Sequence, residues 1–357
     1  MKTAHCIAGL ALGLAGPALA AEDAPPPLPD LTLDPAAVSV MGVSSGGYMA
    51  TQLAVAYPEL FRGLAVFAAG PWGCAQGELS RALGQCMSLR KGLPDRDTLE
   101  ARLTNYRDDN LVGTASALAD QHVYLWHGDE DNTVEPALGE RLAAQYRDWL
   151  KAPEAQLKVV RQPDAGHGLP VDADSLANAP APELADCREG GPPHLLDCGV
   201  DGAGEALSWL YGQDEGADDV TGSATATPSA ERLLTFDQTA FDDDLAEQGY
   251  LYVPKACESG NSCGLVVALH GCNMSAEAIG EDFVRHSGLN HWAETNDLVV
   301  IYPQVTASLA NPQGCWDWWG YEESLWQLEP QHDSRAGEQL TGLVNMVRAL
   351  VGKPDAP

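Results

Sequence analysis

One segment, Val38-Ser-Val-Met-Gly-Val-Ser-Ser-Gly-Gly-Tyr-Met-Ala50, predicts a buried strand, a sharp turn and the start of a helix. Apolar residues alternate along the strand, and helix-forming residues run from Tyr48 to Ala56. The turn between them reads Gly42-Val-Ser-Ser-Gly46, which is the pattern G-x-S-x-G. Strand, G-x-S-x-G and helix together are typical of a nucleophile elbow, in which the serine hydroxyl stands clear of the sheet. We therefore predict that Ser44 is a nucleophile.

The same turn predicts a first donor for an oxyanion. Gly42 and Gly46 are small enough for strand and helix to pack closely around Ser44, so that the backbone N–H of Ser45 points at the charge that develops on an attacked carbonyl. A turn that is merely rich in glycine and serine is the alternative, because G-x-S-x-G alone is a weak pattern. The strand and helix on either side favour the elbow, and we expect Ser45 to be an oxyanion donor.

Residues 1–20 have a basic start, an apolar middle and a small-residue end, Ala18-Leu-Ala20. This order is typical of a secretory signal peptide. A membrane anchor is the alternative, but the apolar run is shorter than the roughly 20 residues that a membrane span needs. We expect cleavage after Ala20 and a secreted protein, either extracellular or periplasmic.

The cysteines fit an exported protein. Nine are present, and removal of Cys6 with the signal peptide leaves an even number. Disulfides are then more typical than metal ligation or free thiols, although eight cysteines allow about a hundred connectivities and spacing alone leaves the pairing open. Pairing in sequence order predicts four bridges: Cys74–Cys86, Cys187–Cys198, Cys257–Cys263 and Cys272–Cys315.

The chain is strongly acidic, with 51 Asp and Glu against 20 Lys and Arg and a formal net charge of −31. Such a surface repels the phosphates of nucleic acid and of anionic membranes. We therefore expect neither a nucleic-acid partner nor a membrane partner. An acidic surface also stays soluble in salt, which fits a saline habitat and says nothing about the chemistry.

Apolar strands alternate with amphipathic helices along the chain, which predicts a doubly wound α/β sheet with mostly parallel strands. Residues 21–30 are expected to be a flexible lead-in, and residues 212–232 a joining loop that is polar and lacks periodicity. We expect one catalytic domain over residues 21–357. Besides the elbow strand, the predicted strands are 64–70, 122–128, 157–160, 249–254, 265–270 and 298–302, and the clearest helices are 135–151, 204–211 and 336–351.

A serine nucleophile needs a general base, and the base needs a carboxylate that holds its tautomer. Acidic residues follow the strand 122–128 in the segment His127-Gly-Asp-Glu-Asp-Asn-Thr-Val134. We predict Asp131 over Asp129 as the acid, because H-G-x-x-D-x-x-V is the usual acid-loop pattern of α/β-hydrolases. The alternatives are a solvated acidic turn and a calcium loop; the segment lacks the Gly and closing Glu of an EF-hand.

The general base is predicted at His167, in Ala165-Gly-His-Gly168 after a strand. The chain order Ser, Asp, His is the one found on α/β-hydrolase sheets. A lone histidine is more often structural or merely exposed, but the position after the acid loop favours a catalytic role. His194 is the nearest rival, although it lies in a Pro-rich loop beside an expected disulfide.

A second oxyanion donor is expected from another strand end. The segment Leu265-Val-Val-Ala-Leu-His-Gly-Cys-Asn273 is a buried strand that ends in His-Gly, as in the oxyanion loops of lipases and esterases. This predicts the backbone N–H of Cys272 as the donor, and a bridge to Cys315 would stiffen the loop. An ordinary strand and turn with a structural disulfide is the alternative.

The order of these parts indicates a circular permutation. In α/β-hydrolases the oxyanion strand normally precedes the nucleophile elbow, whereas here it follows the elbow by more than 200 residues. If the chain is read as a circle, the closing helix 336–351 runs into the elbow strand, and residues 212–232 join the original ends. Surface termini that lie close together make such a rearrangement tolerable.

With these residues identified, the chain resembles the extracellular poly(3-hydroxybutyrate) depolymerases, specifically the permuted single-domain type known from fungi. The resemblance covers nearly all of the mature chain and is specific because the motifs occur together and in this order. They are the elbow Gly42–Gly46, Gly128-Asp-Glu-Asp-Asn-Thr-Val134, Ala165-Gly-His-Gly168, Tyr252-Val-Pro-Lys-Ala-Cys257, His270-Gly-Cys272, Ile301-Tyr-Pro-Gln304 and Cys315-Trp-Asp-Trp-Trp-Gly320.

The resemblance implies the roles that the residues themselves predict, with Ser44, Asp131 and His167 as the triad and main-chain Ser45 and Cys272 as oxyanion donors. It also implies a disulfide-stapled α/β-hydrolase fold, a polyester substrate, no cofactor and no metal, and we expect a monomer. We expect no separate polymer-binding domain, although many bacterial relatives carry one. The family's aromatic crevice for a polyester strand is expected at Trp316, Trp318, Trp319, Tyr302 and Tyr48, with core packing as the alternative for each.

Taken together, the sequence predicts a secreted serine esterase that hydrolyses poly(3-hydroxybutyrate), or related short-side-chain polyhydroxyalkanoates and oligomers, through an acyl-enzyme. A related carboxylesterase is the first alternative, acting on feruloyl or acetyl groups of polysaccharide or on aromatic polyesters, because fold and triad are shared. An inactive secreted polymer-binding protein is the second, which the intact triad disfavours.

Overall fold

The computed structural model describes residues 24–31, 33–173, 184–212, 227–258, 262–323 and 330–352. The predicted signal peptide lies outside these ranges, as do residues 213–226 of the predicted joining loop. None of the helices within the ranges is long and apolar enough to cross a membrane.

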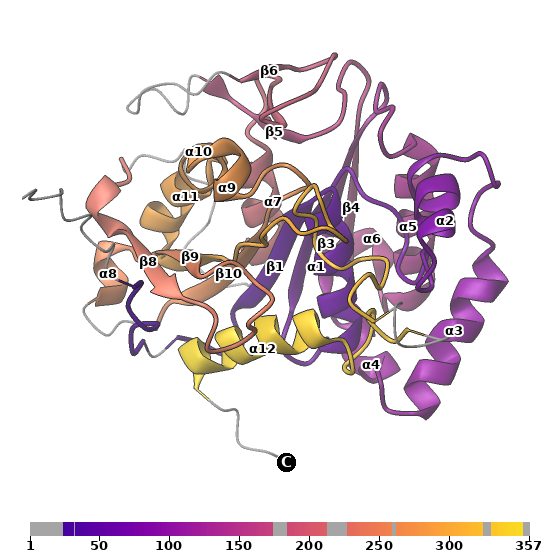
Figure 1. The fold of residues 1–357 in the computed structure, drawn as a ribbon, viewed down its shortest axis with the longest axis horizontal. Coiled ribbons are helices and arrows are strands. Elements are labelled where there is room, and N and C mark those ends of the chain that lie inside the picture. The colour runs from indigo at the N-terminus through magenta and orange to yellow at the C-terminus, as the bar shows by residue number, and fades with distance from the viewer. Residues whose placement is uncertain are drawn as a thin grey trace, which may run out of the picture.

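An eight-stranded sheet forms the centre of the molecule, in the order β4-β3-β2-β1-β10-β11-β9-β8 (Figure 1). The six strands from β4 to β11 are parallel, while β9 pairs antiparallel with both β11 and β8. The predicted doubly wound, mostly parallel sheet is therefore confirmed. The strands are β1 Val38–Val43, β2 Gly63–Phe67, β3 His122–Gly128, β4 Leu157–Gln162, β8 Leu233–Asp237, β9 Gln248–Tyr252, β10 Gly264–Leu269 and β11 Leu298–Tyr302.

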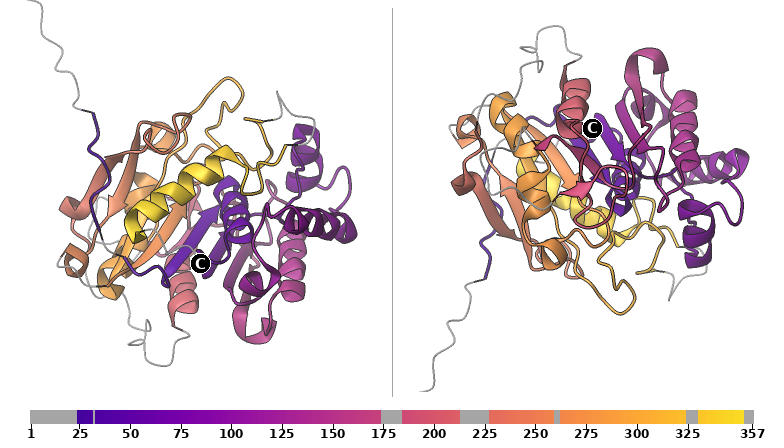
Figure 2. Two further views of the ribbon diagram at one scale, coloured as in Figure 1. Left: turned by 90° about the horizontal axis from the view of Figure 1, so that it is seen from below. Right: turned by 90° about the horizontal axis from the view of Figure 1, so that it is seen from above.

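Helices cover both faces of this sheet. The helices α1 Ser45–Ala56, α5 Pro136–Trp149 and α12 Glu338–Val351 pack on one face, where α12 lies across the strands beside α1 (Figure 2). The other face carries α7 Gly202–Tyr211, α10 Asp282–His286 and α11 Leu289–Asn296. The connections hold one further long helix, α3 Arg96–Asp108, and a small sheet of β5 Leu169–Val171, β6 Ala185–Asp186 and β7 Leu195–Asp197. They also hold shorter helices: α2 Leu79–Arg81, a π-helix Ala82–Met87, α4 Ala115–Ala119, α6 Pro153–Gln156, a 3-10 turn Ala230–Arg232, α8 Lys255–Glu258 and α9 Ala276–Ile279.

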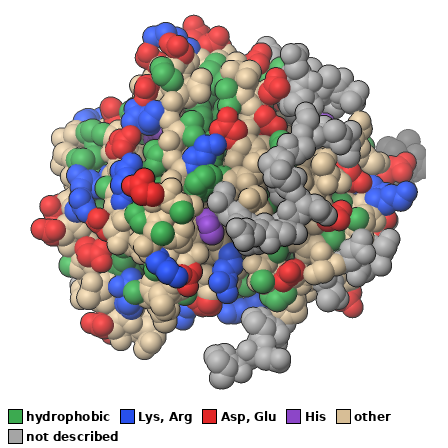
Figure 3. All heavy atoms as spheres, turned by 180° about the vertical axis from the view of Figure 1, so that it is seen from behind, with side chains coloured by type: hydrophobic (Ala, Val, Ile, Leu, Met, Phe, Trp, Pro, Cys, Tyr) green, Lys and Arg blue, Asp and Glu red, His purple; other side chains and the backbone are tan. Residues whose placement is uncertain are grey.

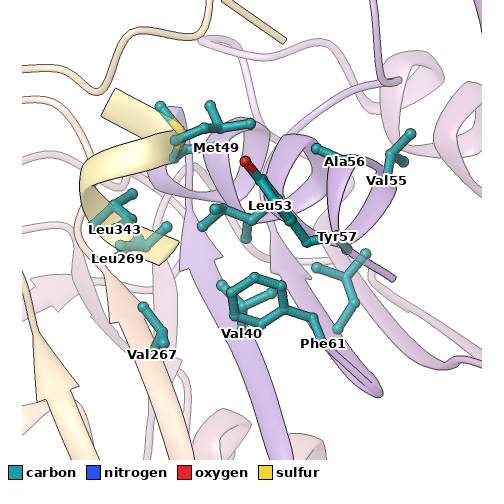
Figure 4. Close-up of a cluster of buried hydrophobic side chains, with 14 of the residues drawn as sticks. Val40, Met49, Leu53, Val55, Ala56, Tyr57, Phe61, Val267, Leu269 and Leu343 are labelled. Carbon is teal, nitrogen blue, oxygen red and sulfur yellow. The ribbon is translucent and has the colours of Figure 1, made fainter. Parts of the chain in front are cut away.

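The core between the sheet and its first helical layer is built by alternation along the strands. Val40 of β1 and Val267 of β10 face the same side, and Leu53 of α1 and Leu343 of α12 pack over them (Figure 4). All four side chains are at most 1% exposed. Burial of each such side chain contributes about 1.5–3 kcal/mol, so this layer fixes the position of the elbow between β1 and α1.

The predicted helix ends differ slightly from the structure, and the helix expected over residues 135–151 spans Pro136–Trp149. The helix expected from residue 204 begins at Gly202, because the Asp201 carboxylate accepts the N–H of Gly204 at 2.8 Å and caps the first turn. The helix expected from residue 336 begins at Glu338. The four predicted disulfides are all present, each between the cysteines that sequence order pairs.

The circular permutation stays a prediction, and one contact supports it. The seam that it requires lies between α12 and the segment before β1. There the backbone N–H of Leu33 donates to the carbonyl of Leu350 at 3.3 Å. The end of the last helix is thus joined directly to the chain that enters the elbow strand.

The surface charge is dispersed on the face opposite to the view of Figure 1. Among the residues described on that face, acidic and basic side chains are interspersed, and the basic ones do not gather into one patch (Figure 3). The net negative charge therefore acts as a general property of the surface rather than as a local binding feature on this face.

Candidate active site

The elbow has the strained backbone that its pattern predicts. Ser44 lies between β1 and α1 with φ 56° and ψ −120°, a conformation that non-glycine residues rarely adopt. Gly42 and Gly46 face each other across the turn, where a Cβ on Gly42 would collide with the Gly46 carbonyl. Because α1 starts at Ser45, the amides of its first turn and the positive end of its dipole lie beside the Ser44 hydroxyl.

The position of Gly46 leaves no room for a side chain. A Cβ at this position would collide with the carbonyl oxygens of Leu269 and His270, at the end of the neighbouring strand β10. Backbone atoms cannot rotate away, so Gly46→Ala is expected to lower the free energy of unfolding by about 3 kcal/mol and to abolish activity. Thermal or denaturant unfolding measures this. Gly84→Ala is the matched control, because the nearest atoms there belong to the flexible Lys91 side chain at 3.1 Å. Equal stability of the two variants would contradict the prediction.

Three predicted residues from three different loops meet at the elbow. His167 Nε2 lies 2.9 Å from Ser44 Oγ, and His167 Nδ1 lies 2.8 Å from Asp131 Oδ2. Asp131 follows β3 and His167 follows β4, so all three residues lie at the carboxyl ends of parallel strands. A continuous hydrogen-bonded chain therefore runs from a buried carboxylate through an imidazole to a hydroxyl, as in a Ser-His-Asp triad.

Asp131 is held ionised by its surroundings. Oδ1 accepts the backbone N–H groups of Thr133 and Val134, each at 2.9 Å. Burial raises the pKa of the carboxyl, but hydrogen bonds from His127 and His167 outweigh burial, and the pKa lies well below its usual value. Asp129, the alternative acid, pairs instead with Arg161 on the adjacent strand.

The loop closed by the disulfide Cys187–Cys198 packs over His167. The backbone N–H of Gly166 donates to the Cys187 carbonyl at 2.7 Å. His194, the rival base, belongs to this loop and meets the His167 ring edge to face, with centroids 5.9 Å apart. Burial and the charge of His167 lower the pKa of His194. The imidazole that reaches Ser44 is thus the predicted one, and its rival packs beside it.

The loop after β10 lies against the nucleophile. A Cβ on Gly271 would be 3.2 Å from the Cβ of Ser44, so the Gly271–Cys272 peptide passes next to the elbow. The His270 ring holds this peptide: Nδ1 donates to the Gly271 carbonyl at 2.8 Å, and Nε2 accepts the Val305 N–H at 3.2 Å. Burial lowers the pKa of His270 to about 4, which keeps the ring neutral. The arrangement suits a rigid oxyanion donor.

Comparison with known proteins places this geometry in a family. The model of the prolyl oligopeptidase family matches residues 30–181, a range that contains Ser44, Asp131 and His167. A polyhydroxybutyrate depolymerase of Talaromyces funiculosus is 34% identical over 347 residues, which cover 93% of this chain and 94% of that relative. The chain belongs to the poly(3-hydroxybutyrate) depolymerase family. The resemblance predicted from the sequence is therefore confirmed.

Two further comparisons describe the extent of the likeness to poly(3-hydroxybutyrate) depolymerases. A depolymerase of Delftia acidovorans is 32% identical over 345 residues, which cover 95% of this chain and 64% of that relative, so this chain is considerably shorter. A solved structure of a serine-to-alanine depolymerase variant, complexed with an R3HB trimer, superposes with a TM-score of 0.77 at 34% identity and covers 91% of this chain and 98% of that one. The predicted α/β-hydrolase fold is confirmed by this superposition.

The aromatic crevice expected of a poly(3-hydroxybutyrate) depolymerase requires a correction in this chain. Trp316 and Tyr302 are fully buried core residues, so their predicted contact with substrate is wrong. Trp316 Nε1 donates to the His270 carbonyl at 2.9 Å, and the Tyr302 hydroxyl donates to Asn290 at 2.7 Å. The polar groups of both side chains are therefore hydrogen-bonded inside the protein. Trp316 thereby holds the His270 peptide at the end of β10, while Tyr302 binds α11.

The other three aromatic residues form a stack beside the elbow. The Tyr48 ring lies flat on Trp318, with centroids 4.4 Å apart, and the Tyr48 hydroxyl donates to the Cys86 carbonyl. At 4% and 6% exposure, these two rings offer little surface to a ligand. Trp319 is half-buried and meets Trp318 edge to face at 5.4 Å. Of the five predicted aromatics, Trp319 therefore exposes the most surface.

Two features of the site were not predicted from the sequence. His127 donates towards Asp131, and Asn311 brackets Cys315 by accepting its N–H at 2.9 Å and donating to its carbonyl at 2.7 Å. The sequence offers one signal for His127, its place as the first residue of the pattern H-G-x-x-D-x-x-V. It offers no signal for Asn311. Among the described residues, the carboxylates that could share a metal ion are Asp242, Asp243 and Asp244, none of which belongs to the triad.

Proposed function

We propose that this protein is a secreted serine esterase that hydrolyses poly(3-hydroxybutyrate), or related short-side-chain polyhydroxyalkanoates and oligomers, through an acyl-enzyme. The observation that carries the proposal is the hydrogen-bonded chain from Asp131 through His167 to Ser44, in a member of the depolymerase family. The four disulfides support export to an oxidising compartment.

Each chemical step uses groups of the chain itself. His167 Nε2 accepts the Ser44 proton while Oγ attacks the ester carbonyl, and Asp131 stabilises the imidazolium that forms. The backbone N–H groups of Ser45 and Cys272 receive the oxyanion. His167 then protonates the departing alcohol oxygen. Water, activated by the same imidazole, attacks the acyl-enzyme and releases the acid.

The substrate class follows from the relatives and from the chemistry of the surface near the elbow. The Talaromyces funiculosus relative is a polyhydroxybutyrate depolymerase, and the solved neighbour contains an R3HB trimer. In this chain we assign the aromatic contact with the methyl-bearing ester units to Trp319, which extends the buried pair Tyr48 and Trp318 towards the surface.

The substrate prediction is tested with a suspension of poly(3-hydroxybutyrate). Purified enzyme is expected to clear the suspension and to release hydroxybutyrate monomer and dimer, identified by mass, whereas Ser44→Ala leaves it turbid. If the suspension stays turbid while a soluble short-chain ester is hydrolysed in a Ser44-dependent manner, the protein is an esterase but the polymer assignment is wrong. If neither substrate is consumed, the proposed function is wrong.

A further inference from the structure

His127 contacts both ends of the turn formed by residues 131–134, which follows β3. Its side chain is 4% exposed and lies at the end of β3, four residues before Asp131. Nε2 is 2.9 Å from the carbonyl oxygen of Val134 and 3.2 Å from Asp131 Oδ2. Both neighbours are acceptors, so Nε2 carries the proton and donates. One imidazole N–H thus holds the carboxylate and the peptide carbonyl that closes its turn.

The opposite edge of the His127 ring is fixed by α5. A Cβ on Gly139 would lie 2.5 Å from His127 Nδ1, so only glycine leaves room for the ring in this position. Gly139 is inside a helix of 14 residues, where glycine costs about 1 kcal/mol relative to alanine. The space for His127 is therefore maintained at the expense of helix stability.

Asp131 consequently has four donors that divide between its two oxygens. The backbone N–H groups of Thr133 and Val134 bind Oδ1, while His167 Nδ1 and His127 Nε2 share Oδ2. We propose that His127 is a positioning residue of the triad, which fixes Asp131 Oδ2 towards His167 and shares that oxygen with it. This inference rests on the proposed function, because it acts through the triad.

The donor from His127 also affects the pH dependence of the reaction. An N–H dipole from His127 offsets part of the negative charge that His167 experiences. Without it, Oδ2 attracts the proton of the His167 imidazolium more strongly, which favours the protonated form of the base. The acid limb of kcat/KM, which follows the unprotonated base, then moves to higher pH. At the same time the carboxylate loses a constraint on its orientation, which lowers kcat.

Four other titratable side chains lie near the imidazoles of His127 and His167. His194 faces His167 from the loop 187–198, and burial lowers its pKa. The Tyr48 hydroxyl lies on α1 within the electrostatic reach of Asp131, and burial raises its pKa. Glu140 of α5 and Arg161 of β4 line the small cavity beside His127 and bind each other at 2.9 Å. Substitution of His127 is expected to leave all four in place, so a shifted acid limb would report on Oδ2.

The test compares His127→Phe with His127→Gln in the full-length enzyme. Phe keeps the ring and removes the donor, whereas the Gln amide nitrogen can occupy the position of Nε2. His127→Phe is expected to lower kcat about 10- to 100-fold, to leave KM within about 2-fold and to move the acid limb to higher pH, by analogy with the loss of other orienting partners. His127→Gln is expected to recover most of kcat. His286→Phe, the same change at a buried histidine of α10, is the control.

Active sites are counted with a fluorophosphonate label so that kcat refers to folded enzyme. If His127→Phe has the kcat and the acid limb of the wild type, the inference is wrong. The proposed function would still stand in that case, provided that hydrolysis depends on Ser44. If His127→Phe does not fold, Gly139→Ala provides the test, because its Cβ displaces the ring without removing it. A lower kcat with a shifted limb supports the inference, and unchanged values overturn it. Activity that survives Ser44→Ala would overturn the proposed function itself.

Discussion

Ser44→Ala is expected to lower kcat for ester hydrolysis by about 10⁶-fold and to leave the fold intact. The hydroxyl is the group that His167 Nε2 contacts at 2.9 Å, and without it no acyl-enzyme can form. Alanine fits the space of serine, and Ser44 Oγ has no structural partner other than His167 among the hydrogen bonds of the described residues. The rate with a soluble short-chain ester and the thermal unfolding midpoint together measure this prediction.

Ser116→Ala is a suitable control for Ser44→Ala, because Ser116 is exposed on α4 and its hydroxyl binds the neighbouring Thr114 side chain. It is expected to retain full activity. Mass spectrometry after fluorophosphonate treatment adds a second measurement: the label is expected on Ser44 in the wild type and on no residue of the Ser44→Ala variant. A label on another serine, or a variant that retains more than a thousandth of the rate, would contradict the role of Ser44.

The meeting of Ser44, Asp131 and His167 could be predicted from the sequence because each residue belongs to a local pattern. Ser44 lies in a strand, turn and helix, Asp131 follows a strand in an acid loop, and His167 stands between two glycines after the next strand. Patterns of this kind depend on neighbours in the chain, and a parallel sheet brings its strand ends together at one edge. The meeting of the three side chains follows from these two facts.

The supporting residues could not be predicted in the same way. His127 acts through a bond that forms only when the turn folds back by four residues, and His270 acts through hydrogen bonds to the Gly271 carbonyl and to the distant Val305 N–H. Whether an aromatic ring faces substrate or core depends on packing between distant segments, so the sequence does not show that Trp316 and Tyr302 are buried. The antiparallel strand β8 also went unpredicted, since its partly exposed residues lack a clear alternation.

Asp131→Asn is expected to lower kcat by about 10⁴-fold while the protein stays folded. The reason lies in the division of donors around the carboxylate. The N–H groups of Thr133 and Val134 bind Oδ1, so an asparagine would keep its carbonyl oxygen there and turn its NH₂ group to the position of Oδ2. That NH₂ donates to His167 Nδ1, which forces the proton onto Nε2. The imidazole then presents an N–H to Ser44 Oγ and cannot accept its proton.

The pH profile separates this effect from that of His127→Phe. Loss of the carboxylate removes the charge that stabilises the His167 imidazolium, so the acid limb of kcat/KM is expected to move to lower pH. Loss of the His127 donor moves the limb the opposite way. Asp129→Asn is the control for charge alone, since Asp129 lies on the same loop but pairs with Arg161, and it is expected to stay within about 2-fold of wild type. If Asp129→Asn rather than Asp131→Asn loses activity, the acid of the triad is misassigned. If the acid limb of Asp131→Asn stays at the wild-type pH, Asp131 acts on the fold and not on the base.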